Sequence, residues 1–107
     1  MLRLARFRLI FAPETANHLA AIERKHYRLI RSVIHEQLSV TPEQVTRNRK
    51  TLEHPAPFGA TWELRFGPRN RFRVFYEVDR NERVVWVLAI GVKEENRLYV
   101  GGKEFGR

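Results

Sequence analysis

The densest group of side chains that can bind or process an anion lies between residues 47 and 73. This stretch holds seven basic residues but only two acidic ones, Glu53 and Glu63. The basic residues are Arg47, Arg49, Lys50, Arg65, Arg69, Arg71 and Arg73. A surface of that sign attracts polyanions such as RNA, DNA, acidic lipid headgroups or an acidic protein. The alternative interpretation is a solvated basic surface without a partner.

Other chemistries are poorly supported by the sequence. The chain has no cysteine, which excludes a disulfide framework, a thiolate nucleophile and a cysteine-bearing metal site. Its four histidines share no ligand spacing, and no glycine-rich phosphate loop is present, so we expect neither a metal nor a cofactor. The longest apolar run, residues 84–90, is too short to span a bilayer, and the N-terminal residues lack the apolar stretch of a signal peptide. We therefore expect a cytoplasmic protein with no membrane partner.

Two periodicities predict the elements that must position the basic residues. Alternating or continuously apolar stretches, typical of strands, occupy residues 2–11, 62–66, 71–78 and 84–92. Apolar residues at helical spacing follow Pro13 and recur from Tyr27 to Leu38, with a short turn between the two helices. The region 41–58 is expected to be irregular. We predict one α+β domain over residues 1–107, in the order β-α-α-β-β-β, whose antiparallel sheet has a helical hairpin packed on one face.

Period-two alternation gives the middle strands an apolar face and a basic face. The residues expected to face the helices are Trp62, Leu64, Phe66, Phe72, Val74 and Tyr76. Arg65, Arg71 and Arg73 then lie on the opposite, open face, where strands about 4.8 Å apart bring Arg65 and Arg73 together. Like charges so placed need an anion between them, either a bound polyanion or the cross-strand acids Glu63 and Glu77.

The segment that follows the last predicted strand carries three further candidates. Lys93, Arg97 and Tyr99 lie where the chain returns past the edge of the sheet, within reach of the open face. Packing of the Tyr99 ring on the core is the alternative for that residue.

Five stretches, taken in this order and at this chain length, closely resemble the RelE/ParE toxins of bacterial and archaeal toxin–antitoxin modules. They are Phe11–Glu14, Thr46–Lys50, Trp62–Arg65, Arg71–Val78 and Val87–Lys93. The resemblance covers nearly the whole chain and implies a compact β-α-α-β-β-β fold with a concave basic working face. It also implies one of two activities. RelE-like members are ribosome-dependent endoribonucleases that cut mRNA by 2′-hydroxyl attack without a metal, and ParE-like members inhibit DNA gyrase.

The resemblance assigns roles to single residues. Arg65 and Arg73 fall on basic positions of the RelE-type site and are expected to clamp a phosphate, which guanidinium groups match in geometry. Lys93 falls on a basic position after the last strand and is expected to neutralise developing charge. Tyr99 matches a late tyrosine and is expected to stack on a base or orient the 2′-hydroxyl.

Glu63 stands where the RelE-type pattern has a basic residue. It is the one carboxylate expected beside the arginines, which makes it a candidate general base. The departure fits a different acid–base arrangement, a weaker nuclease or a non-nuclease member.

The expected RNA contacts are Arg47, Arg49, Lys50, Arg71 and Arg97. The predicted function is a type II toxin that cuts mRNA on the ribosome and inhibits translation, with a cognate acidic antitoxin as its partner. The alternative is a gyrase inhibitor or a degenerate homologue that only binds its antitoxin.

Overall fold

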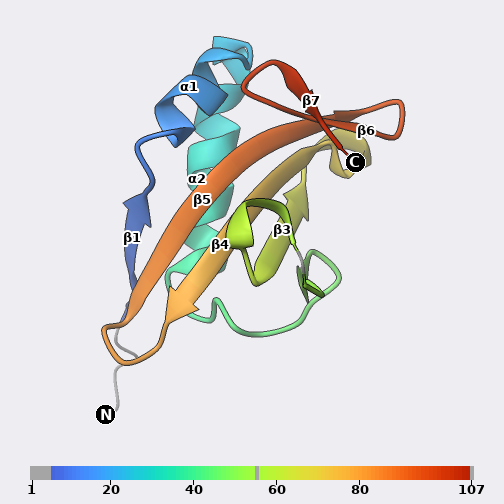
Figure 1. Cartoon of the computed structure of the whole chain (residues 1–107). Coiled ribbons are helices and arrows are strands. Elements are labelled where there is room, and N and C mark those ends of the chain that lie inside the picture. The colour runs from blue at the N-terminus through green and yellow to red at the C-terminus, as the bar shows by residue number, and fades with distance from the viewer. Residues whose placement is uncertain (1–5, 55, 107) are drawn as a thin grey trace.

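A single seven-stranded sheet forms the framework of the protein, whose computed structural model describes residues 6–54 and 56–106 (Figure 1). Six strands are hydrogen-bonded in chain order: β2 (Arg49–Thr51), β3 (Trp62–Phe66), β4 (Phe72–Asp79), β5 (Val84–Glu94), β6 (Arg97–Val100) and β7 (Lys103–Phe105). The remaining strand, β1 (Arg8–Phe11), pairs with β5. The predicted α+β fold is confirmed, although β1 and β5 are parallel and the sheet is therefore not wholly antiparallel. Residues 2–5 of the first predicted strand lie outside the described residues.

The helices lie between β1 and β2 in the chain and cover one face of the sheet (Figure 1). They are α1 (Thr15–Ala20), a 3₁₀ turn (Arg24–His26) and α2 (Tyr27–Leu38). Ile30, Ile34 and Leu38 recur every four residues on α2 and are all buried, which is the stripe expected of a helix packed on a core. The two predicted helices and the turn between them are confirmed.

The main core lies between α2 and the sheet. All six residues predicted to face the helices are buried in it, together with Val85, Val87 and Ile90 of β5. The fully buried Tyr76 donates a hydrogen bond from its hydroxyl to the carbonyl of Pro42 at 2.7 Å. Burial raises the pKa of the Tyr76 hydroxyl, so this donor stays protonated at physiological pH. The alternation of β3 and β4 thus directs their apolar side chains as predicted.

The opposite face of the sheet is only partly open. Phe75 of β4 and Ala89 of β5 are buried there beneath Ala60, in a second small cluster. Partly buried side chains from the preceding loop and from β5 and β6 complete it, namely Leu52, Leu88, Leu98 and Val100. The basic part of this face is therefore confined to the neighbourhood of β2, β3 and the ends of β4 and β5.

Three short strands arise where the sequence predicts none. β2 is a three-residue strand inside the region expected to be irregular, and β6 and β7 form a hairpin after β5. Gly101 and Gly102 turn that hairpin with φ values of +63° and +80°, which glycine adopts without steric strain. Short strands of this kind owe their structure to tertiary pairing rather than to a local hydrophobic pattern.

One edge of β5 is completed by a side chain instead of a strand. β1 pairs with residues 84–87 of β5 and β6 with residues 91–94. Between them, the backbone N–H of Ile90 donates to Nδ1 of His18 at 3.3 Å. An imidazole nitrogen accepts such a bond only when it is unprotonated. Burial accordingly lowers the pKa of His18, an effect partly opposed by the negative charge of Glu14.

Candidate functional site

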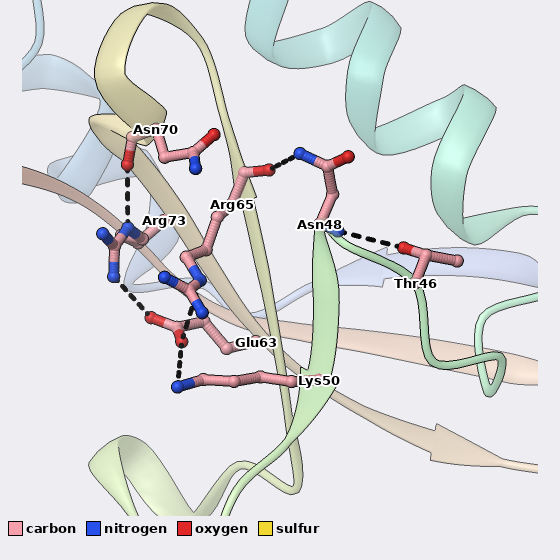
Figure 2. A network of polar contacts seen from close by, with 7 residues as sticks. All are labelled: Thr46, Asn48, Lys50, Glu63, Arg65, Asn70 and Arg73. Atoms are coloured by element: carbon pink, nitrogen blue, oxygen red, sulfur yellow. Dashed lines mark hydrogen bonds and ion pairs between the residues drawn. The ribbon is translucent and has the colours of Figure 1, made fainter.

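A buried carboxylate surrounded by three cations forms the centre of the candidate site (Figure 2). The side chain of Glu63 on β3 is only 8% exposed. Its Oε2 lies 3.2 Å from a guanidinium nitrogen of Arg73, which donates a hydrogen bond to it. Its Oε1 lies 3.9 Å from Nε of Arg65 and 3.8 Å from Nζ of Lys50. Four charged groups from three adjacent strands thus meet on the face opposite the helices.

The strand register explains why these four residues meet. Lys50 on β2 is paired with Glu63 on β3, and Arg65 on β3 is paired with Arg73 on β4. Directly paired residues project on the same face of a sheet, so two arginines are held side by side. Glu63 lies next to both and offsets their repulsion. Of the two acids expected to neutralise the arginines, Glu63 does so, whereas Glu77 is exposed and lies further along β4, opposite Trp86.

Two asparagines that no sequence pattern singles out hold the arginines in place. Nε of Arg73 donates to the carbonyl of Asn70 at 2.9 Å. Nδ2 of Asn48 donates to the carbonyl of Arg65 at 2.9 Å, and the Arg65 N–H donates back to the Asn48 carbonyl at 2.8 Å. Thr46 in turn accepts a hydrogen bond from the Asn48 N–H (Figure 2). The only signal for these two asparagines in the sequence is the short turn in which each lies. Their hydrogen-bond partners are backbone atoms, which no residue pattern identifies.

The β3–β4 turn that carries Asn70 depends on a glycine. Gly67 has a φ of +82°, and a Cβ at this position would lie 2.6 Å from Cδ2 of Phe72. Any other residue would therefore be strained in backbone and in packing. The turn sets the point at which β4 begins and thereby the position of Arg73, the second residue of that strand.

A hollow of about 900 Å³ adjoins the cluster and is rich in cations. The basic residues that line it are Arg69, Arg71, Arg73 and Lys93. Glu94 and Glu95 also line it, and Arg71 is paired with Glu94 at 3.2 Å. Arg69 belongs to the basic stretch of the sequence, but its position there predicts no particular role for it. Arg73 belongs both to the Glu63 cluster and to this hollow, so the two form one surface.

Arg49 does not belong to that surface. It is paired with Leu64 and buried on the helix side of the sheet, with 6% of its surface exposed. Its guanidinium donates to the carbonyl of Gln37 at 2.8 Å and to the carbonyl of Thr41. Arg49 therefore joins the end of α2 to β2, and the expectation that it contacts RNA conflicts with this position.

Tyr99 also lies differently from the expected arrangement. It is paired with Val92, which packs against the main core, so its ring projects toward the helix side of the sheet. There it lines a 490 Å³ cavity with His18 and Ile22, and it also lines the basic hollow. Tyr99 and the Glu63 cluster thus occupy opposite faces.

The other predicted contacts surround the cluster more loosely. Arg47 is exposed on the loop before β2. Arg97 is exposed and paired with Glu104 at 3.4 Å. Lys93 lines the basic hollow together with Arg71 and Arg73.

Within residues 6–54 and 56–106, no three histidine, aspartate or glutamate side chains gather as ligands for a metal ion. None of the helices in the described part of the chain is long and apolar enough to cross a membrane.

Comparison with known proteins identifies the family. The family model described as the ParE toxin of the type II toxin–antitoxin system parDE matches residues 9–97. The chain therefore belongs to the RelE/ParE family of type II toxins. Among solved structures, the chain is similar to one in the crystal structure of the toxin–antitoxin complex RelBE2 from Mycobacterium tuberculosis, with a TM-score of 0.58 and 16% sequence identity. That match covers 85% of this chain and 95% of the other, and it supports the fold. No curated protein matches the sequence.

Proposed function

We propose that this toxin is a ribosome-dependent endoribonuclease that inhibits translation by cutting mRNA. The observation that carries the proposal is the Glu63 cluster, in which a carboxylate and three cations adjoin a hollow lined by four cations. Cleavage of RNA by its own 2′-hydroxyl needs a group that accepts a proton and cations that stabilise the phosphorane. Glu63 supplies the first, and Arg65, Arg73 and Lys93 supply the second.

In the proposed reaction Glu63 accepts the proton of the ribose 2′-hydroxyl. The 2′-oxygen then forms a bond to phosphorus, the bond from phosphorus to the 5′-oxygen breaks, and the leaving oxygen takes a proton from solvent. The products are a 2′,3′-cyclic phosphate and a 5′-hydroxyl end. Arg73 must exchange part of its contact with Glu63 for the phosphate, while its bond to the Asn70 carbonyl keeps it in position. Tyr99, which lines the hollow from the other side of the sheet, contacts the substrate rather than the reacting proton.

The proposal is tested by adding the purified toxin to ribosomes that are translating a defined mRNA. Primer extension should reveal new 5′ ends within codons, and the same mRNA without ribosomes should remain intact. Intact transcripts on ribosomes, together with growth arrest when the toxin is expressed, would exclude the nuclease.

Inhibition of DNA gyrase is the second candidate, and two observations favour it. The matching family model is described as a ParE toxin. In addition, Glu63 is already ion-paired with Arg65 and Arg73, the cations that would otherwise bind a phosphate. A supercoiling assay with purified gyrase distinguishes the two candidates. A gyrase inhibitor blocks supercoiling or stabilises cleaved DNA and leaves translated mRNA intact, whereas the nuclease does the reverse.

The proposed protein partner is an acidic antitoxin encoded beside this gene. The chain carries a formal charge of +8, and the similar solved chain is part of a toxin–antitoxin complex. An apolar hollow of 440 Å³ lies where β1, α1 and α2 meet, lined by Phe11, Leu19 and Tyr27 with Arg31 and His35 among them. It suits an acidic segment that folds on binding. Co-purification with a neighbouring acidic gene product, weakened by added salt, is expected, and a salt-independent complex would contradict this charge complementarity.

A further inference from the structure

A second hollow adjoins the basic one and differs from it in character. It has a volume of 680 Å³ and is lined by Pro57, Arg97, Leu98 and Phe105, among others. Lys93 and Asn96 line both hollows, so the two are adjacent. The cross-strand pairs Lys93–Leu98 and Leu98–Phe105 place all three side chains in one row on the face of the Glu63 cluster. An aromatic ring thus lies two strands away from Lys93, a cation of the proposed cleavage site, with Leu98 between them.

The Phe105 ring is supported from below by other aromatic residues. It stacks on Phe58 with ring centroids 4.7 Å apart and an interplanar angle of 27°. Phe58 in turn contacts the buried Phe75 at 5.9 Å. The three rings extend from the second cluster beneath the sheet face to the surface. Phe105 is therefore positioned by its stacking on Phe58.

The backbone of Phe58 is in an unfavourable conformation. Its φ is +61°, which is a genuine outlier for a bulky residue outside glycine. Two hydrogen bonds of the surrounding turn hold it there, from Gly59 to Ala56 and from Ala60 to Pro57. Such strain persists where the surroundings over-determine it and concentrates at functional sites.

Both rings remain accessible from solvent. Phe58 and Phe105 are 38% and 39% exposed, so part of each ring is open to contact by a ligand. Exposed rings beside cations are how proteins hold single-stranded RNA, with bases stacked on the rings and phosphates held by arginine and lysine. The basic hollow contains four cations, and the second hollow offers the aromatic ring.

We propose that the 680 Å³ hollow is a nucleobase subsite, in which a base of single-stranded RNA stacks on Phe105 while the neighbouring phosphate lies at Lys93. This inference rests on the proposed function for its substrate class, and it adds the residues that hold a base next to the cleaved bond. Phe58 is a positioning residue that supports Phe105 from below. The pair Arg97–Glu104 borders the hollow and opens to let the backbone pass.

The test compares binding of a fluorescent single-stranded RNA oligonucleotide with binding of its abasic counterpart of equal length. Phe105→Ala and Phe105→Leu should both weaken binding of the base-bearing RNA about tenfold and leave abasic binding within about twofold. Phe105→Leu keeps an apolar side chain over Phe58, so it separates stacking from a loss of local folding. Phe105→Tyr should bind as the wild type does.

Two controls define the other outcomes. Trp86→Ala removes a similarly exposed ring on β5 and should leave binding of both oligonucleotides unchanged, whereas Lys93→Ala should weaken both. Equal effects of Phe105→Leu on the two oligonucleotides, or equal affinity of the wild type for both, would overturn the subsite. Because no ribosome is present, failure of the nuclease proposal shows separately, as uncut mRNA in translating ribosomes with base-dependent binding intact.

Discussion

β3 and β4 bury apolar side chains on one face of the sheet and charged side chains on the other. Toward the helices, Leu64 and Val74 are fully enclosed by apolar neighbours. On the other face of the same strands, Glu63 and Arg73 are nearly as well enclosed but carry charges. Burying apolar surface stabilises a fold, whereas a buried ion pair is weak evidence for stability, since desolvation offsets much of its attraction. The comparison indicates that the apolar contacts on the helix side contribute more to the stability of these strands than the ion pairs on the other side do.

The helix-side face should give the largest loss of stability. Leu64→Ala removes a fully buried side chain and leaves a cavity, so the free energy of unfolding should fall by about 3 kcal/mol. Val45→Ala, at a residue that is 64% exposed, should change it by less than about 0.5 kcal/mol. Urea denaturation measures both. An equally small effect at Leu64 would mean that the core is not packed as described.

The charged face should show a smaller effect that depends on its partner. Arg73→Met keeps much of the side-chain volume but removes the shortest ion pair of the buried Glu63, so stability should fall by about 1–2 kcal/mol. In Glu63→Gln/Arg73→Met the loss should be smaller than the sum of the single changes, because no uncompensated carboxylate remains. Strict additivity in this double-mutant cycle would show that the two side chains do not interact.

The smallest effect concerns His18, which joins the two faces at the edge of β5. Its pKa is below the ordinary 6.5 in the folded protein, so the unfolded chain binds more protons as pH falls through that value. Stability should therefore be unaffected by His18 above neutral pH and should decrease on acidification below about pH 6.5. The difference between the wild type and His18→Asn isolates this residue from the other histidines. A difference that does not vary between pH 7.5 and 5.5 would contradict the bond to Ile90.

Alternation was sufficient to predict the fold and the apolar face. In β3 and β4 the apolar residues alternate, and in α2 they recur at helical spacing, so each element has one apolar side that is buried. Such periodicity can be read from a short stretch of sequence. The same alternation predicted that Arg65 and Arg73 would be neighbours, with Glu63 as their neutralising acid. These residues lie on long strands whose register the apolar face determines.

Positions on short strands could not be predicted in this way. Arg49 and Tyr99 lie on β2 and β6, and each projects to the helix side. The face of Tyr99 depends on the two-residue turn at Glu95 and Asn96, which have φ values of +50° and +66°. A shift of one residue in such a hairpin would move Tyr99 to the other face. The polar hydrogen bonds of Asn48 and Asn70 to backbone carbonyls likewise depend on the tertiary fold.

The most direct test of the central proposal compares Glu63→Gln with Glu77→Gln in the ribosome cleavage assay. Glu63 lies on β3 and Glu77 on the neighbouring β4, but of the two only Glu63 contacts Arg65 and Arg73. We expect Glu63→Gln to slow mRNA cleavage by about a hundredfold or more, because the proton acceptor is lost. Urea denaturation of this variant should still show the cooperative unfolding of a folded protein. Glu77→Gln should cut at the wild-type rate. Cleavage by folded Glu63→Gln at the wild-type rate would show that the Glu63 cluster is not the site of catalysis.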